Sequence, residues 1–258
     1  MDPGVPSFPR FKWPKHLPAL SEEQQRISDD FMKHWLELLP TRYWPIETFN
    51  HTYPTRRLPN QAHWRTLELG AGIGGHLKYE DLSRQDYHCI ELRESIAAET
   101  RKLFADVTMV TGDCQQHIPY ADEYFDRVVA VHVLEHLPRL PDALDQVDRV
   151  LRPGGIISAV LPCDPGLAYE IGRKLSAERL FKRRYHMSYR WLARREHINS
   201  PAEILYLLLQ RFQEQERTYF PLRIPIINLN LCIGITLKKP DTATHAEDHR
   251  GADDHREG

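Results

Sequence analysis

This sequence of 258 residues contains few cysteines and no long apolar run, and its net charge is small. The four cysteines are widely spaced without a C-x-x-C pair, which argues against a zinc ribbon or a disulfide scaffold and fits a reducing compartment. No segment approaches the roughly 20 apolar residues that cross a bilayer, and residues 1–15 lack the apolar core of a signal peptide. The formal net charge of -2 gives no overall attraction to nucleic acid or to anionic membranes. We therefore expect a cytoplasmic protein without a membrane span.

The most informative feature that is present is a glycine-dense turn after an apolar strand, with the sequence LELGAGIGG at residues 67–75. Glycines let a backbone turn sharply and bring bare amides against a ligand. Residues 76–86 fit a helix, whose N-terminus favours anionic groups, and residues 87–90 fit the next strand. The glycine spacing alone satisfies both a dinucleotide site and a methyl-donor turn. No segment after the fourth expected strand looks like a hydride-transfer site.

Acidic residues follow the next two expected strands. Glu91 stands about 20 residues beyond the glycine turn, where a carboxylate can accept hydrogen bonds from two ribose hydroxyls. Asp113 follows the strand expected at residues 107–110, where an adenine amino group could be bound. Further strands are expected at residues 127–131 and 156–161. Ligand-binding groups therefore cluster after the first four strands.

These features together resemble the class I S-adenosylmethionine-dependent methyltransferases, and in particular methyltransferase type 11. The resemblance runs from about residue 64 to residue 161. It rests on the LELGAGIGG turn, Glu91, the pair Gly112-Asp113, the VHVLEHL segment at 131–137 and the LRPGG turn at 151–155. It implies a doubly wound α/β fold with a mostly parallel seven-stranded sheet, the Rossmann-like methyltransferase fold, and S-adenosyl-L-methionine as the cofactor.

The resemblance also implies a role for each residue of the donor site. The amino acid part of the donor falls to Glu68 and the turn, the ribose to Glu91 beside Leu92, the adenine to Asp113 with Cys114, and the sulfonium region to His132. The residues of the turn are Gly70, Ala71, Gly72 and Gly74. Family members commonly carry Asp where this chain has Glu68, which is one methylene longer.

The segment His132-Val133-Leu134-Glu135-His136 also matches an inverted zinc-protease pattern. His132 directly follows a buried strand, so the two histidines need not share a helix face, and no third ligand is evident. We assign no metal on this pattern. A milder hypothesis remains open, because some methyltransferases of this kind use a divalent ion near the equivalent Glu and His to orient the acceptor.

Methyl transfer to a hydroxyl needs one base, because the sulfonium is already activated. His136, with Glu135 beside it, is the first choice, since imidazole titrates near pH 7 and this position should face the transferred methyl group. A basic and aromatic segment at about 165–199 supplies candidate acceptor-binding residues. These are His186, Arg190 and His197.

The chain divides into three parts by composition. Residues 1–63 should form an N-terminal helical cover, with a capped helix from Ser21 that ends at Pro40 and a loop or short helix at 43–60 over the mouth of the donor site. Residues 64–239 should form the methyltransferase domain with its insertion at about 165–199. Its last two strands, at 217–220 and 231–237, should pair antiparallel at the sheet edge. The apolar connection at 222–230 could line an acceptor pocket or pack on the N-terminal helix, and residues 240–258 should be a disordered tail.

We therefore expect an S-adenosylmethionine-dependent methyltransferase that acts on a small-molecule acceptor, by O-methylation of a sugar or secondary-metabolite hydroxyl. One alternative is methylation of nucleic acid or of a phosphate-bearing acceptor through the basic residues at 173–195. Another is a donor-binding subunit without chemistry. The oligomeric state has no signature in the sequence.

Overall fold

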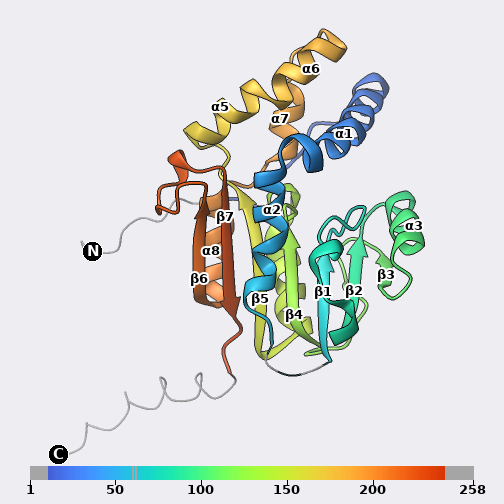
Figure 1. Ribbon diagram of the computed structural model, residues 1–258, viewed down its shortest axis with the longest axis vertical. Coiled ribbons are helices and arrows are strands. Elements are labelled where there is room, and N and C mark those ends of the chain that lie inside the picture. The colour runs from blue at the N-terminus through green and yellow to red at the C-terminus, as the bar shows by residue number, and fades with distance from the viewer. Residues whose placement is uncertain (1–10, 60, 62, 242–258) are drawn as a thin grey trace, which may run out of the picture.

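One mixed sheet of seven strands organises the computed structural model, which describes residues 11–59, 61 and 63–241 (Figure 1). The strand order is β3-β2-β1-β4-β5-β7-β6, and β7 is antiparallel to both of its neighbours while the other pairs are parallel. The predicted fold class and the antiparallel pair at the edge are confirmed. The strands are β1 (Trp64–Leu69), β2 (Gln85–Glu91), β3 (Thr108–Thr111), β4 (Phe125–Val131), β5 (Leu151–Pro162), β6 (Gln213–Phe220) and β7 (Cys232–Lys238).

Helices cover both faces of this sheet. The apolar sides of α4 (Leu140–Val150) and α8 (Pro201–Arg211) are buried in the main core with the strands. On the other face, α2 (Trp44–Thr52) and the 3-10 turn η1 (Pro54–Arg56) lie over β5 and β7. The Tyr53 ring lies so close to Gly234 that a Cβ at that position would be 2.4 Å from a ring atom. Helix α3 (Glu94–Leu103) packs beside β2 and β3.

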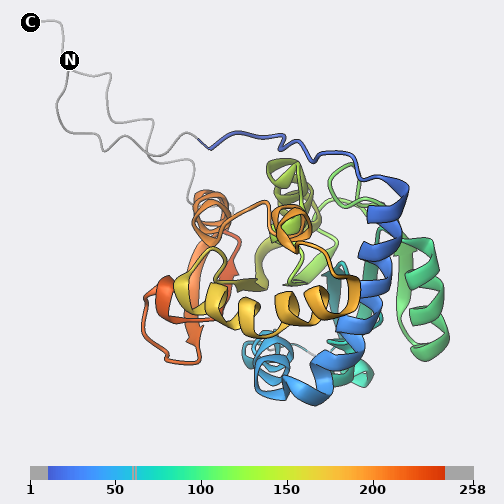
Figure 2. The same cartoon turned by 90° about the horizontal axis from the view of Figure 1, so that it is seen from above.

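The insertion forms three helices at the carboxyl end of the parallel strands. They are α5 (Leu167–Leu175), α6 (Ala177–Tyr185) and α7 (Arg190–Glu196). Seen from above, α5 and α6 cross over that end of the sheet (Figure 2). The N-terminal helix α1 (Glu22–Arg42) packs on α6, where Phe31 and Phe181 meet edge to face at 5.2 Å in a second core. The basic side chains of this segment are mostly exposed, while its aromatic residues are mostly buried or half-buried.

The predicted end of the N-terminal helix is corrected. The predicted cap at Ser21 is present, since its Oγ accepts from the backbone N–H of Gln24 at 3.2 Å, but the helix continues past Pro40 to Arg42. A proline removes one backbone hydrogen bond, a local cost that the other bonds of this 21-residue helix outweigh. The segment at 43–60 lies over β5 and β7, and a Cβ built on Gly75 of the glycine turn would be 3.3 Å from the His51 ring, so its place over the mouth of the donor site stays a prediction. Tyr53 is buried there, whereas Trp44 is exposed.

The helix predicted at 76–86 is also wrong. The structure has two 3-10 turns, η2 (Leu77–Tyr79) and η3 (Leu82–Arg84), and β2 begins at Gln85. Buried polar contacts explain the difference. Glu80 lies 2.7 Å from His76 and 2.8 Å from Arg127, and the Gln85 amide donates to Glu80 as well. These contacts turn the segment inward, because a buried charge is stable only when it is paired.

The apolar loop after β6 lies beside α5 and leaves Leu222, Ile224, Ile226 and Leu229 exposed. Packing of this loop on the N-terminal helix is therefore wrong, and a role at the acceptor pocket stays a prediction. Asn230 holds the loop, since its amide donates to the carbonyls of Ile224 and Ile226. Within the described residues, no helix is long and apolar enough to cross a membrane. Residues 242–258, within the predicted tail, lie outside the described part of the chain.

Candidate active site

The glycine turn lies at the carboxyl end of β1 and has an open side. Gly72 has a φ of +53°, and a Cβ built on it would have no atom within 4 Å. The Gly72 N–H donates to Oε2 of Glu91 at 3.2 Å, and its carbonyl accepts from Thr100 at 2.7 Å. Gly70, Ala71 and Gly74 complete the turn, with the Gly74 N–H donating to the Ala71 carbonyl. The turn therefore presents backbone to empty space, which fits a closely bound methyl donor.

Glu91 occupies the predicted ribose position at the end of β2. Only 5% of the residue is exposed, and its Oε1 accepts from the backbone N–H of Arg93 at 3.1 Å. Each carboxylate oxygen keeps a further lone pair, so two ribose hydroxyls could still donate to it. Leu92 is exposed next to it, so its side chain is accessible to a bound donor.

The predicted adenine site follows β3. Asp113 accepts from the Gln115 backbone at 2.9 Å and from the Gln115 and Gln116 amides. Burial raises the pKa of Asp113, but these hydrogen bonds outweigh it and hold the pKa below its usual value. Cys114 is buried, and burial raises the pKa of its thiol to about 12. Asp113 is thus an ionised carboxylate held in place by hydrogen bonds, and Cys114 contributes an uncharged, apolar side chain.

Glu68 lies on β1, two residues before the glycine turn begins at Gly70, and is almost fully buried. The residue is 2% exposed, and its Oε2 accepts from the Tyr87 hydroxyl at 2.9 Å. Burial raises the pKa of Glu68, against the opposing influence of His76 and Tyr87. Its predicted contact with the amino acid part of the donor stays a prediction.

The turn after β4 carries the remaining predicted groups. His132 has a φ of +51°, and the 3-10 turn η4 (Leu134–His136) follows it. The His132 ring contacts Oε1 of Glu135 at 3.1 Å. Burial raises the pKa of the fully buried Glu135, but His132 and His136 outweigh it and hold the pKa low. Burial lowers the pKa of His132, but the Glu135 and Cys232 side chains overcome this and raise it. His132 and Glu135 therefore form an ion pair beside the glycine turn.

His136 and His197 come together from distant parts of the chain. Their ring centroids lie 5.4 Å apart, and Nδ1 of His197 contacts Oδ2 of Asp164 at 2.9 Å. Burial lowers the pKa of His136, and the nearby His197 lowers it further against the opposing charge of Glu135. His136 is thus uncharged near neutral pH, which a general base requires.

Asn199 holds this arrangement together, although nothing in its local sequence marks it as part of a site. Its amide donates to the carbonyls of Leu134 at 3.0 Å and Leu137 at 2.7 Å. The backbone N–H groups of Ile198 and Asn199 both donate to the Glu135 carbonyl. The loop between α7 and α8 is therefore fixed to the turn after β4.

The three predicted acceptor-binding residues divide between two hollows. His197 and Arg190 line a hollow of about 390 Å³ together with Asp164 and Arg173. His186, at the C-terminal end of α6, lines a separate hollow of basic side chains along α6. His197 thus joins the candidate active site, Arg190 lies in the hollow next to it, and His186 belongs to another surface.

The order of strands, glycine turn and acidic residues in this chain has a match among known families. Residues 67–159 fit the family model described as a methyltransferase domain. This segment is a methyltransferase domain. S-adenosylmethionine is the donor that this family and its class I fold use, in agreement with the prediction.

Curated relatives of this methyltransferase domain match over part of their length. A sterol 24-C-methyltransferase of Yarrowia lipolytica is 27% identical over 166 residues, which cover 53% of this chain and 43% of the relative. A malonyl-(acyl-carrier protein) O-methyltransferase of Enterobacter lignolyticus is 31% identical over 102 residues, which cover 40% of each. The chain thus spans less than half the length of these relatives. Their names give carbon in one case and oxygen in the other, so the similarity does not select the acceptor atom.

Solved structures of methyltransferases are similar in fold to most of this chain, beyond the segment that the family model matches. A TehB-like S-adenosylmethionine-dependent methyltransferase from Corynebacterium glutamicum has a TM-score of 0.57 and 14% identity. The alignment covers 83% of this chain and 99% of that one. The class I methyltransferase fold is thereby confirmed.

Proposed function

We propose that this chain is an S-adenosylmethionine-dependent methyltransferase that methylates a hydroxyl group of an apolar small molecule. The observation that carries the proposal is the meeting of Glu135, His136 and His197 beside the glycine turn. Val133 links the two places, since its side chain would lie 2.8 Å from a Cβ on Gly70. A donor held by the turn and an acceptor held near the histidines would therefore be neighbours.

The chain has to supply alignment and a proton acceptor. When bound, S-adenosylmethionine supplies a methyl group already activated by its positive sulfur. His136 is uncharged near neutral pH and 36% exposed at its side chain, so it can take the proton from an acceptor hydroxyl. Glu135 lies 3.9 Å from the His136 ring, where its charge would stabilise the imidazolium that forms.

Exposed apolar side chains near this end of the sheet favour an apolar acceptor. Leu167, Ile171 and Leu175 recur at every fourth residue of α5, so they lie along one side of that helix. The loop at 222–229 contacts α5 and adds four exposed aliphatic residues. Clusters of this kind mark ligand or partner sites more often than isolated surface residues do. The name of the sterol-methylating relative supports the same class of acceptor.

An acceptor screen tests this proposal. Release of S-adenosylhomocysteine is measured with hydroxylated apolar acceptors, such as sterols and alkylated phenols, and with free sugars. We expect turnover with the apolar group and a loss of about 100-fold in His136→Gln, because general-base catalysis contributes roughly this factor. The exposed His117, changed to Gln, is the matched control. Turnover with sugars alone would contradict the apolar acceptor, and donor binding without any turnover would favour the non-catalytic subunit.

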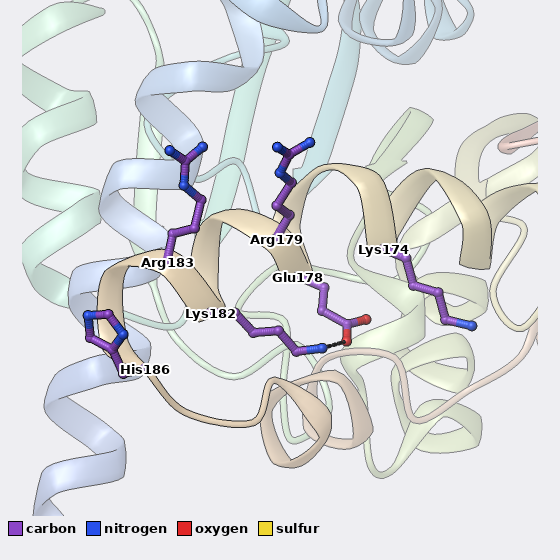
Figure 3. A pocket seen from close by; sticks show the side chains of 6 residues that line it. All are labelled: Lys174, Glu178, Arg179, Lys182, Arg183 and His186. Atoms are coloured by element: carbon purple, nitrogen blue, oxygen red, sulfur yellow. Dashed lines mark ion pairs between the residues drawn. The ribbon is translucent and has the colours of Figure 1, made fainter.

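A second candidate function is methylation of a phosphate-bearing acceptor, and one observation favours it. Along α6, a hollow of about 810 Å³ is lined by Lys174, Glu178, Arg179, Lys182, Arg183 and His186. Figure 3 shows Arg179 and Arg183 extending side by side, while Lys182 is paired with Glu178. Arginine pairs at this spacing suit phosphate oxygens. Acceptor binding would then weaken steeply as salt increases, whereas a neutral acceptor would show little change.

A further inference from the structure

Three potential metal ligands meet at the candidate active site. Glu135, His136 and His197 each offer one ligand atom, and these atoms all lie within 4.8 Å of one another. Glu135 and His136 come from the turn η4, and His197 comes from the end of α7. Metal–ligand bonds are about 2.0–2.2 Å long, so small side-chain rotations would bring these three atoms onto a single ion.

One oxygen of Glu135 is available to a cation. The residue is fully buried, and its Oε1 contacts His132, but its Oε2 has no hydrogen-bond partner among the described residues. A buried carboxylate oxygen without a donor is costly, so such an atom needs a partner such as a water molecule or an ion. His132 contacts the other oxygen, Oε1, and His136 is 3.9 Å from that oxygen, beyond hydrogen-bond distance.

His197 is held in the way that metal-binding histidines commonly are. Its Nδ1 contacts Oδ2 of Asp164 at 2.9 Å, which leaves Nε2 as the nitrogen available to an ion. Carboxylates in this position fix the orientation of a ligating ring and increase its basicity. The side chains of both His197 and Asp164 are mostly buried, so the pair is a built feature of the site.

We propose that Glu135, His136 and His197 bind a divalent transition-metal cation. One carboxylate and two imidazoles suit zinc, cobalt, manganese or ferrous ions and leave coordination positions open. His132, which contacts Oε1 of Glu135 at 3.1 Å, is not one of the three ligands. The site therefore differs from the inverted zinc-protease pattern, because its third ligand lies on a distant segment.

The metal-binding site is inferred from the positions of its three ligands, whereas its use in catalysis rests on the proposed function. A cation here would bind the acceptor hydroxyl and lower its pKa. The O–H bond breaks and its proton passes to solvent water, while the new C–O bond forms as the S–C bond of the donor breaks. The products are the methyl ether and S-adenosylhomocysteine. His136 then acts as a ligand, and the cation replaces it as the group that activates the hydroxyl.

The test is titration of the full chain with Co²⁺, followed by visible absorption and by calorimetry. Wild type should show a saturable absorption band and one binding event that His136→Gln and His197→Gln lack. Asp164→Asn should weaken this event by at least about tenfold, as loss of an orienting carboxylate does. Histidines elsewhere in the chain contribute equally to all samples, and His117→Gln should behave as wild type.

Equal spectra and equal stoichiometry in wild type and in both ligand variants would overturn the proposal. Circular dichroism checks the folding of each variant, and His136→Gln, whose side chain is 36% exposed, carries the test if His197→Gln fails to fold. Titration with S-adenosylmethionine in the absence of metal tests the proposed function by itself. Donor binding without Co²⁺ binding would remove the metal site and leave the proposed function standing.

Discussion

The imidazole rings of His136 and His197 lie 5.4 Å apart, at an interplanar angle of 56°, although they belong to the turn after β4 and to the end of α7. The contact is long-range, and backbone and side-chain hydrogen bonds from the loop after α7 maintain it. The chemistry proposed for this protein depends on that contact. Its support can be tested apart from the histidines themselves.

Asn199→Ala should destabilise the protein by about 2–4 kcal/mol, because two carbonyls that accept from its amide would be left buried without that donor. Urea unfolding measures the loss, and the exposed Asn228, changed to Ala, is the control. We also expect slower methyl transfer, since His197 would no longer be held against His136. Unchanged stability relative to the control would show that Asn199 does not fix this loop.

Two glycines of the turn should respond differently to alanine. Both have positive φ, so each substitution costs about 1–2 kcal/mol of backbone strain. At Gly74 the new Cβ would also lie 2.4 Å from the Phe104 ring, which should add about 1–3 kcal/mol. At Gly72 the Cβ meets no protein atom, so its main effect should be weaker donor binding. Thermal unfolding and calorimetry separate these effects, and equal destabilisation by both substitutions would contradict this account.

Glu80→Gln should destabilise the protein by about 3–5 kcal/mol at pH 7, because it leaves the buried Arg127 without its carboxylate. Burial raises the pKa of Glu80, but His76 and Arg127 outweigh it and hold the folded-state pKa below the unfolded value. A lowered carboxyl pKa stabilises the fold above the unfolded pKa, and this contribution is lost as the pH falls through the folded value. The difference between wild type and variant should therefore narrow below about pH 4, near the unfolded pKa of glutamate. Urea unfolding across this range measures it, and a constant difference would disprove the pairing.

Glu68→Gln should change the stability of the protein in the opposite direction, by stabilising it at higher pH. Burial raises the folded-state pKa of Glu68 above the unfolded value, so ionisation destabilises the fold as the pH rises through that interval. Glutamine keeps an acceptor for the Tyr87 hydroxyl and carries no charge. The free energy of unfolding of the variant, relative to that of wild type, should thus be larger at pH 8 than at pH 5. Parallel pH dependence of the two proteins would show that Glu68 is not held in this way.

The sequence was sufficient to predict the elements whose signals are local. The glycine turn, the strands on either side of it and the carboxylate at Glu91 lie where their patterns indicate. The helix predicted at 76–86 failed because its polar residues are buried against Arg127 from another strand. Periodicity within one segment cannot report such a partner, because tertiary contacts override local propensity.

The sequence was sufficient to predict the residues on each side of the site, but not that they meet. The VHVLEHL segment identifies Glu135 and His136, and the basic segment led to His197 as an acceptor-binding residue. Their meeting depends on Asn199 and on the pairing of His197 with Asp164, which act between distant segments. No pattern within either segment contains this information.

The central claim is that the turn after β1 and Glu91 hold S-adenosylmethionine, and calorimetric titration of the full chain with this donor and with NAD tests it most directly. Wild type and Glu99→Ala, an exposed control on α3, should bind the donor and not NAD. Glu91→Ala should weaken donor binding by at least about tenfold, because two charge-assisted hydrogen bonds to the ribose are lost. Absence of donor binding in wild type, or a preference for NAD, would contradict the account.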